Sequence, residues 1–242
     1  FEALSDGNVD IYSFVEAGGL GAATTAGTSN DMTSNNTVTL TGSLKTEKED
    51  QDITLASSDT VKASVKAEAN TQGGAAGGAT AETVNEITRT NKVDVSGNIR
   101  SMDDVNLYAG KDGSGKKGRI EQEVAAEAYN SAFIPVAAPT LKNEVEQNNN
   151  INVASDKKVE SVRDINLFAN EGEVRMSESN IKYTWATGTD ETGSYVTSSQ
   201  GDTESKGFVK KNSVDIAGDL TAGIQNKQEI TISGTVDFDK KM

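Results

Sequence analysis

The sequence predicts an all-β protein and, within that class, a parallel β-solenoid in which short strands wind into stacked coils. The main observation is a repeated phrase: DVNLYA at residues 104–109 returns as DINLFA at residues 164–169. Weaker copies occur at residues 8–12, 52–56 and 229–233. Each copy alternates branched apolar residues with polar ones, as a strand with one buried face does. In addition, no long stretch keeps the three- and four-residue apolar spacing of a helix.

A second alternating phrase precedes each complete copy and ends in a glycine, which we interpret as a corner. It is found at residues 36–42, 91–97 and 212–218, whereas the third copy, at residues 151–155, has Ser155 instead of glycine. Glycine at a corner supplies backbone angles that other residues reach only at a cost. A lone apolar residue follows each corner: Leu44, Ile99, Val159 and Leu220. One repeat is therefore a strand, a corner, a brief strand, a turn and a strand, which describes one coil of a parallel β-solenoid.

The apolar residues of these phrases are predicted to form continuous inward rows, each side chain contributing about 1.5–3 kcal/mol on burial. The predicted core comprises Val9, Ile11, Val38, Leu40, Ile53, Leu55, Val93, Val95, Val105, Leu107, Ile151, Val153, Ile165, Leu167, Val214, Ile216, Ile230 and Ile232.

We interpret residues 1–242 as a single elongated solenoid fragment of a larger secreted chain, because residues 1–17 hold only the last phrase of a repeat. The predicted coil units are approximately residues 1–17, 36–57, 91–110, 149–170 and 212–234. Arms of varying length separate them, at residues 18–35, 58–90, 111–148 and 171–211. A protruding arm can vary because it need only return to its starting edge, whereas stacked coils must stay in register.

The first two arms differ in pattern. Residues 18–35 are rich in Gly, Ala, Thr, Ser and Asn, which favours a loop or a poorly packed arm. Residues 58–90 instead contain strict alternation from Val61 to Asn70, a glycine-rich reversal at residues 73–78, and a return limb. This pattern predicts a β-hairpin. A helix over residues 62–70 is the alternative.

The third arm follows a Gly- and Lys-rich turn at residues 111–118 and contains both prolines, Pro135 and Pro139. Because proline cannot donate to a strand ladder, residues 131–139 are predicted to be a tip or an edge. One or two helical turns over residues 121–129 are the alternative.

Composition excludes several functional classes. The chain has 37 acidic and 23 basic residues, a formal charge of −14, and neither cysteine nor histidine. The charge opposes binding to nucleic acid or to an anionic membrane. Without thiolate or imidazole there is no common nucleophile, base or zinc site, and no apolar run approaches the roughly 20 residues of a membrane span. We predict no enzymatic activity, no catalytic residue, no cofactor and no metal site.

Two acidic turns are candidates for calcium ligands, at Asp103–Asp104 and Asp112–Gly113. The glycine-rich nonapeptide of calcium-binding rolls is missing, so we expect solvated carboxylates there. The Asp that precedes each strand phrase is predicted to accept backbone N–H bonds. A β-helical polysaccharide-active enzyme is a remote alternative, because Arg100 and Arg163 lie at turns without an obvious pair of acids.

The residues most suited to binding lie in the arms. Apolar residues at a predicted tip and aromatic residues of the last arm could contact a sugar or a protein: Phe133, Ile134, Pro135, Val136, Tyr183, Trp185 and Tyr195. The alternative, which we favour, is that the arms fold down onto the solenoid and bury these side chains.

The coil-plus-arm pattern, with DVNLYA after a Val-x-Val-x-Gly phrase and with Ala-rich intervals that reverse at Gly-Gly, resembles filamentous-haemagglutinin-like large exoproteins. The leukotoxin-family filamentous adhesins of anaerobic Gram-negative bacteria are the most similar in character. Ser155 and the length of the arms depart from the family's pattern. The resemblance implies a right-handed parallel β-helix, two-partner (type V) export through an outer-membrane transporter, and a location in the medium or on the bacterial surface. It carries over no catalytic residue.

The same resemblance implies a virulence function in contact with a host-cell surface protein or glycan, with the flanking coils of a full-length chain as further partners. Two functions are expected from it: a stalk that presents variable arms for adhesion, or the receptor-binding part of a toxin that kills leukocytes.

Overall fold

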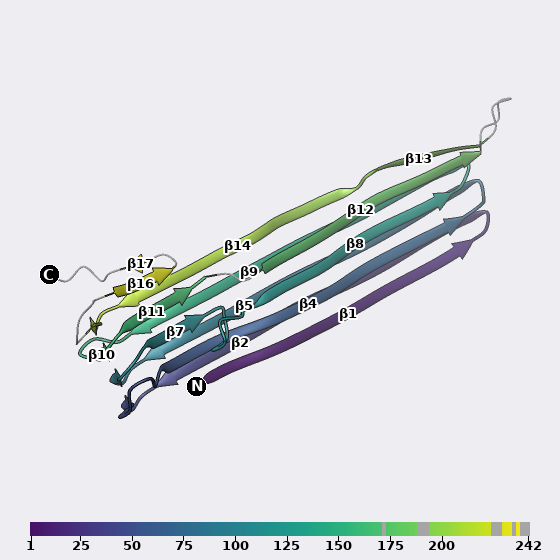
Figure 1. The fold of residues 1–242 in the computed structure, drawn as a ribbon. Helices are drawn as coiled ribbons and strands as arrows, with labels where there is room; N and C mark the ends of the chain where they lie inside the picture. Colours follow the sequence, from purple (N-terminus) through teal and green to yellow (C-terminus); the bar gives the residue numbers. More distant parts are fainter. Residues whose placement is uncertain (171–172, 188–193, 224–228, 234–235, 238–242) are drawn as a thin grey trace.

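The computed structural model describes residues 1–170, 173–187, 194–223, 229–233 and 236–237. The described chain is all-β and contains no helix. Long strands run side by side in two layers, and short strands gather at one end of the molecule (Figure 1). The helical alternatives for residues 62–70 and 121–129 are therefore wrong, since both segments lie within strands.

The strands form three sheets. The first sheet contains β1 (Glu2–Gly18), β4 (Ile53–Gln72), β7 (Val105–Ala109), β8 (Arg119–Ser131), β11 (Asp164–Ala169), β12 (Glu173–Thr187), β13 (Ser194–Gln200) and β16 (Glu229–Ser233). The second contains β2 (Gly21–Leu40), β5 (Ala76–Val95), β9 (Ile134–Val153), β14 (Asp202–Ile216) and β17 (Val236–Asp237). The third contains β3 (Leu44–Lys45), β6 (Ile99–Ser101), β10 (Lys158–Ser161) and β15 (Asp219–Thr221).

Successive repeats pair in parallel and in register. In the third sheet, Leu44 pairs with Ile99, Ile99 with Val159, and Val159 with Leu220. Equivalent residues pair in the same way in the other two sheets: Ile53 with Val105 in the first sheet, and Leu40 with Val95 in the second. The predicted order of strand, corner, brief strand, turn and strand is confirmed. We call the end where the three sheets meet the base, and the long paired limbs that extend from it the arms.

The hydrophobic core of the base draws side chains from all three sheets. It buries Ile53, Leu55, Val93, Val95, Ile99, Val105, Leu107, Ala109, Ile151, Val153, Val159, Ile165, Ala169, Leu167, Val214 and Ala222. Four further predicted core residues are partly buried against this cluster: Val38, Leu40, Ile216 and Ile232. Ile230 pairs with Ile165 through its backbone, and its side chain lies outside the described residues.

The prediction for Val9 and Ile11 places them in the wrong part of the repeat. In β1 they pair with Ala63 and Val65, which belong to an arm, and both are half-buried. The strand begins opposite Ala56, beyond the phrase that starts at Ile53. Residues 8–12 resemble the repeated phrase only because they alternate apolar and polar residues. An arm strand and a base strand both do so, since each has one inward face.

The arm at residues 58–90 is not a hairpin, contrary to the prediction. The limb β4 pairs with β1, β7 and β8, and the return limb β5 pairs with β2 and β9, so the two limbs belong to different sheets. Each limb thus obtains backbone partners from the neighbouring repeats, while its inward side chains pack against the opposite sheet. Among the described strands, only β12 and β13 pair in the antiparallel sense.

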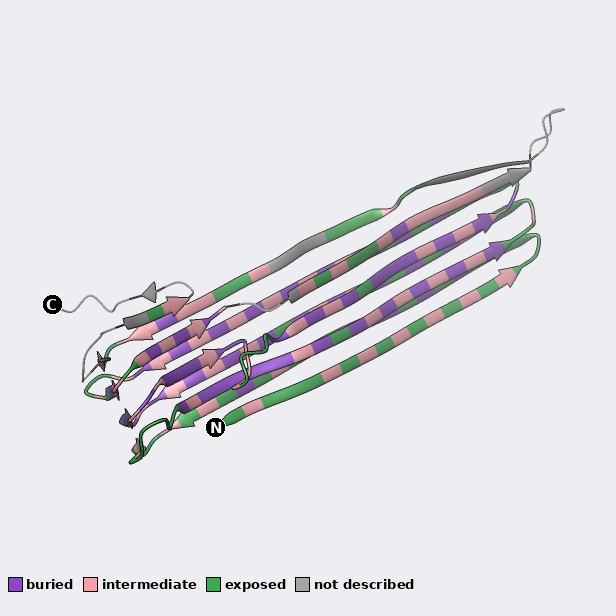
Figure 2. Cartoon of the chain, in the orientation of Figure 1, coloured by how far each residue is buried: buried purple, intermediate pink, exposed green. Residues whose placement is uncertain are grey.

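Residues 18–35 do not form the predicted loop or poorly packed arm, because most of them lie in the 20-residue strand β2. Its inward residues Thr24, Ala26, Thr28 and Asn30 are buried. Thr28 Oγ1 donates to Thr83 Oγ1 at 3.3 Å, and Asn30 Nδ2 donates to Asn85 Oδ1 at 2.8 Å. Small and polar side chains fill the arm interior because equivalent residues of adjacent repeats satisfy one another. Figure 2 shows the resulting alternation of burial along the long strands.

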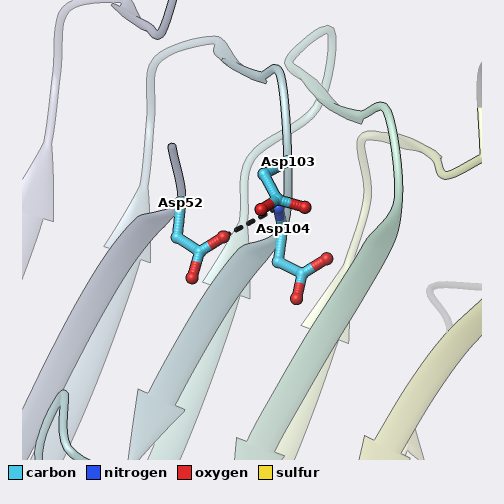
Figure 3. A group of neighbouring side chains, drawn as sticks. All are labelled: Asp52, Asp103 and Asp104. Carbon is cyan, nitrogen blue, oxygen red and sulfur yellow. Dashed lines mark hydrogen bonds between the residues drawn. The ribbon is translucent and has the colours of Figure 1, made fainter. Parts of the chain in front are cut away.

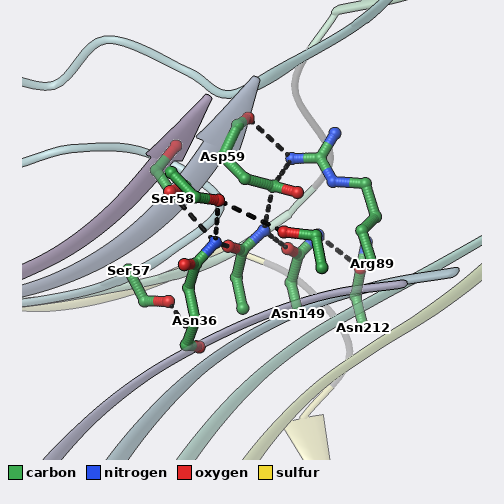
Figure 4. A network of polar contacts seen from close by, with 10 residues as sticks. Asn36, Ser57, Ser58, Asp59, Arg89, Asn149 and Asn212 are labelled. Atoms are coloured by element: carbon green, nitrogen blue, oxygen red, sulfur yellow. Dashed lines mark hydrogen bonds and ion pairs between the residues drawn. The ribbon is translucent and has the colours of Figure 1, made fainter. Parts of the chain in front are cut away.

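A polar network is buried where the base meets the arms (Figure 4). An asparagine ladder crosses four repeats: Asn36 Nδ2 donates to Asn91 Oδ1, Asn91 to Asn149, and Asn149 to Asn212, at 3.4, 3.1 and 3.0 Å. The side chains of Arg89 and Asp59 form an ion pair beside the ladder, and both are fully buried.

Two of the corner glycines, Gly97 and Gly218, are required for close approach to other backbone atoms, and none of the three is required for its backbone angles, which corrects the prediction. Gly42, Gly97 and Gly218 all lack a positive φ. A Cβ on Gly97 would lie 1.7 Å from the carbonyl oxygen of Gly42, in the corner stacked against it. At the third corner, Val153 and Val159 are six residues apart, whereas Val95 and Ile99 are four apart. The longer turn around Ser155 contains Asp156 at a φ of 61°.

Candidate functional site

The predicted tip residues lie at the turn between β8 and β9. Phe133, Ile134 and Val136 are 48%, 59% and 58% exposed, and Pro135 is half-buried. The favoured interpretation, in which the arm folds down and covers this segment, is therefore wrong. The turn lies at the far end of the arm, at the opposite end of the long strands from the base (Figure 2). Phe133 and Ile134 donate backbone N–H bonds to Gly74 and Ala75 of the preceding repeat, and their side chains remain exposed.

Both prolines occupy a locally unpaired strand edge. Pro135 and Pro139 belong to β9 and pair with Gly77 and Ala81 of β5 on one side. On the other side, the described part of β14 begins opposite Thr140. The prediction of a tip or an edge is confirmed.

Tyr183 lies at a second place, on the outward face of the first sheet. Its ring stacks on that of Tyr129, with the ring centroids 4.5 Å apart and the planes 2° from parallel. Tyr183 of β12 and Tyr129 of β8 are register partners, so the rings overlie one another at the spacing of adjacent strands. Trp185 pairs with Ser131 and Val196, and Tyr195 with Ala186, but their side chains lie outside the described residues.

A groove of about 490 Å³ lies over this pair, and we call it the tyrosine groove. Its lining crosses three strands and includes Glu68, Asn70 and Gln72 of β4, Tyr129 and Ser131 of β8, and Tyr183 of β12. Sequence reasoning identified Tyr183 and missed the others. The alternation of Val124, Ala126 and Ala128 does indicate that Tyr129 faces outward, but its neighbours depend on the register between repeats.

Carboxylates fix the polar rim of the tyrosine groove. Tyr129 donates its O–H to Glu127 Oε2 at 2.7 Å, and Tyr12 donates to Glu68 Oε2 at 3.0 Å. Lys66 Nζ lies 3.2 Å from Glu127 Oε2 and 3.3 Å from Glu68 Oε2. Burial raises the pKa of Tyr129, and its bond to Glu127 raises that pKa further, so the phenol remains a donor at neutral pH. With two carboxylates and one ammonium, this side of the groove carries a net negative charge.

A second group of aromatic rings lies at the base. The rings of Tyr108 and Phe168 meet edge to face at 6.5 Å. Lys111 Nζ lies 3.7 Å from the Tyr108 centroid and 4.5 Å from the Phe168 centroid. Burial lowers the pKa of Lys111, and the charge of Lys117 lowers it further. The lysine covers these rings, which makes them a poorer contact surface than the tyrosine groove.

Three carboxylates meet at the base, where they form hydrogen bonds and an ion pair that join adjacent repeats. Oxygens of Asp52, Asp103 and Asp104 lie within 4.8 Å of one another (Figure 3). Asp52 Oδ1 accepts the N–H of Asp104 at 3.0 Å, and Asp104 Oδ1 accepts the N–H of Asp164 at 3.1 Å. Asp103 Oδ1 lies 2.9 Å from Arg163 Nη1. The prediction that the repeated Asp accepts backbone N–H bonds is confirmed, although the donor belongs to the next repeat.

The replacement Asp104→Asn is expected to stabilise the protein at neutral pH. Burial raises the pKa of Asp104. The hydrogen bond from the Asp164 N–H lowers this pKa, but the negative charges of Asp103 and Asp52 raise it further, and the net shift is upward. A raised folded-state pKa means that ionisation costs stability, and this cost grows as the pH rises from the unfolded-state pKa through the folded-state pKa. Asparagine keeps the acceptor for Asp164 without the charge. We expect a melting temperature higher by on the order of 2 °C at pH 7, and no gain below the unfolded-state pKa.

The matched control is Asp112→Asn, for which the opposite sign is expected. Burial tends to raise the pKa of Asp112, but hydrogen bonds from Ser114 and Lys116 outweigh it, so the pKa is lowered. Losing this charge should lower the melting temperature at pH 7. Equal shifts in both variants, measured by circular dichroism across pH 3–8, would contradict the electrostatic explanation.

The described residues include no helix long and apolar enough to cross a membrane. Comparison of the chain with protein-family models, with curated proteins and with solved structures found no match.

Proposed function

We propose that this chain is a stalk segment of a secreted filamentous adhesin, folded as a right-handed parallel β-solenoid, that presents its arms to host cells. The observation that carries the proposal is the parallel pairing of each described repeat with the next, in the arms as well as in the base. The pairing is in register between β2, β5 and β9, and that of β14 with β9 has one irregularity, between Ser205 and Gly207. An array in which each repeat contacts only its neighbours is suited to a long fibre. Export through an outer-membrane transporter and display at the bacterial surface belong to the same proposal.

The exposed features suit binding better than catalysis. The tip at Phe133 to Val136 offers apolar side chains to a partner, and the tyrosine groove combines ring faces with carboxylate and amide groups. Arg163 is engaged with Asp103 at the base, away from the groove. We therefore propose that the chain is not an enzyme, and that a host-cell surface glycan or protein is its partner.

The experiment that tests this function is the addition of purified chain to host epithelial cells and leukocytes, with attachment and lysis scored together. Attachment without lysis supports the adhesive stalk. Lysis of leukocytes would instead favour the receptor-binding part of a leukotoxin. Attachment no greater than that of an unrelated protein of equal charge would contradict both.

Replacing Phe133, Ile134 and Val136 together with serine is expected to reduce attachment without unfolding the chain. About half of each side chain is already exposed, so the melting temperature should stay within about 2 °C of the parent value. The control is Leu4→Ser, which removes another apolar side chain, 53% exposed in β1. Equal attachment by the triple variant and by the control would remove the tip from the proposal.

A further inference from the structure

The tyrosine groove contains one open position in a ladder of rings. The register places Glu16, Asn70, Tyr129 and Tyr183 in one outward row across β1, β4, β8 and β12. Tyr183 covers one face of the Tyr129 ring at 4.5 Å. The row then continues with Asn70, whose short amide does not extend as far as a ring does. Asn70 and its β4 neighbours Glu68 and Gln72 line the groove together with Tyr129.

The open position has the thickness of one ring. Adjacent strands lie about 4.7–4.9 Å apart, so a flat six-membered ring above Asn70 would lie as far from Tyr129 as Tyr183 does. Stacking at this distance is favourable for rings and for the C–H face of a sugar. Because β1 carries Glu16 in this row, the chain itself supplies no further ring.

The groups around the open position are suited to bind hydroxyls. Glu68 and Gln72 flank Asn70 on the same face of β4, two residues away on either side. Tyr12 and Lys66 both bind Oε2 of Glu68, and its Oε1 has no donor among the described residues. A hydrophobic ring would leave these acceptors without partners, whereas a ring that carries hydroxyl groups would satisfy them.

The charge of the rim selects among sugars. The two negative charges of Glu68 and Glu127 outnumber the single positive charge of Lys66. Glu16 adds a third carboxylate at the end of the row. An acidic sugar would meet net repulsion in this place. A neutral sugar meets acceptors for its hydroxyls and an aromatic face for its C–H groups.

We propose that the open face of Tyr129, above Asn70, binds an uncharged pyranose, as found at the end of a neutral host glycan. The proposal rests on the adhesive function proposed above and names the ligand class of one of its surfaces. A monosaccharide of about a dozen heavy atoms on one ring face is expected to bind with a dissociation constant on the order of 1 mM.

Saturation-transfer NMR with methyl β-galactopyranoside, methyl β-glucopyranoside and methyl β-glucuronide tests the proposal. Saturation should reach the C–H protons of the two neutral sugars and not those of the glucuronide. Tyr129→Leu should weaken binding at least about fivefold. Asn70→Tyr should fill the open position with a ring of the chain and abolish binding while the melting temperature holds. The control Tyr108→Leu removes an outward ring of the same sheet outside the groove and should leave binding unchanged.

Two results would overturn the inference: equal binding by the parent and by Asn70→Tyr, or binding of N-acetyltyrosine amide in preference to both neutral sugars. Cell attachment is measured separately on the same variants. If the sugars fail to bind while the parent chain still attaches to cells, the ligand class is wrong and the adhesive function stands. If attachment is absent as well, the proposed function fails with it.

Discussion

Replacing Arg89 with methionine is expected to lower the free energy of unfolding by about 3–5 kcal/mol, because it leaves a buried carboxylate without its counter-charge. The Arg89 and Asp59 side chains are both 0% exposed. In the variant, Asp59 Oδ1 would retain the 2.9 Å bond from Asn91 Nδ2 and lose its ion pair. Urea unfolding followed by circular dichroism measures the loss.

The matched double variant, Arg89→Met with Asp59→Asn, distinguishes an unpaired charge from a loss of packing. The amide introduced at position 59 would still accept from Asn91 but would carry no charge, so most of the lost stability should return. Lys66→Met provides a second comparison, because it removes a surface ammonium that contacts two glutamates and should cost less than about 1 kcal/mol. A double variant as unstable as Arg89→Met alone would show that the cost comes from packing.

Replacing Gly97 with alanine is expected to destabilise the protein by about 1–3 kcal/mol or more, because the added methyl group overlaps the backbone of the stacked corner. Its Cβ would lie 1.7 Å from the carbonyl oxygen of Gly42. Neither corner can yield without shifting β5 or β2, both of which are paired along their length. Thermal unfolding of the purified variant measures the effect.

Gly42→Ala is the control, since it makes the same chemical change at the equivalent position of the preceding repeat. A Cβ on Gly42 has no atom within 4 Å, and Gly42 has no positive φ. Alanine there should be neutral or stabilising by up to about 1 kcal/mol. If both variants lose equal stability, the glycine requirement comes from backbone conformation, as the sequence pattern first suggested.

The base could be predicted from the sequence because its signal is local. Val105, Leu107 and their counterparts alternate with polar residues in every repeat. In three repeats the corner glycine also stands two residues after the last apolar residue of the preceding phrase, as Gly97 does after Val95. This local alternation is sufficient to predict a strand that has one face in a hydrophobic core. The same local signal misplaced Val9 and Ile11, since an arm strand alternates in the same way.

The arms could not be predicted because their pairing is a property of the whole array. Val61 to Asn70 alternates equally well in a hairpin and in a stack, and only the register with β1 and β8 distinguishes the two. The interior of the arm adds to the difficulty. Thr28 and Asn30 have little apolar surface, yet they are buried because Thr83 and Asn85 lie next to them in the following repeat.

The candidate site depended on the same missing information. Tyr183 was recognisable as an aromatic residue in an alternating segment, whereas Tyr129 is 54 residues earlier in the chain by subtraction of their numbers. Their rings meet because β8 and β12 are neighbours in register. The two prolines made the strand edge near Phe133 recognisable, but not the exposure of the Phe133 side chain, for which burial was favoured.

The long paired arms have a mechanical consequence. Hydrogen bonds between strands point across the strands, so in this stack they lie along the direction in which repeats follow one another. A pulling force in that direction therefore loads every bond between two repeats at the same time. The base alone joins adjacent repeats over a few residues in each sheet, whereas β5 and β9 are paired along 20 residues. Longer arms thus make each junction between adjacent repeats more resistant to tension.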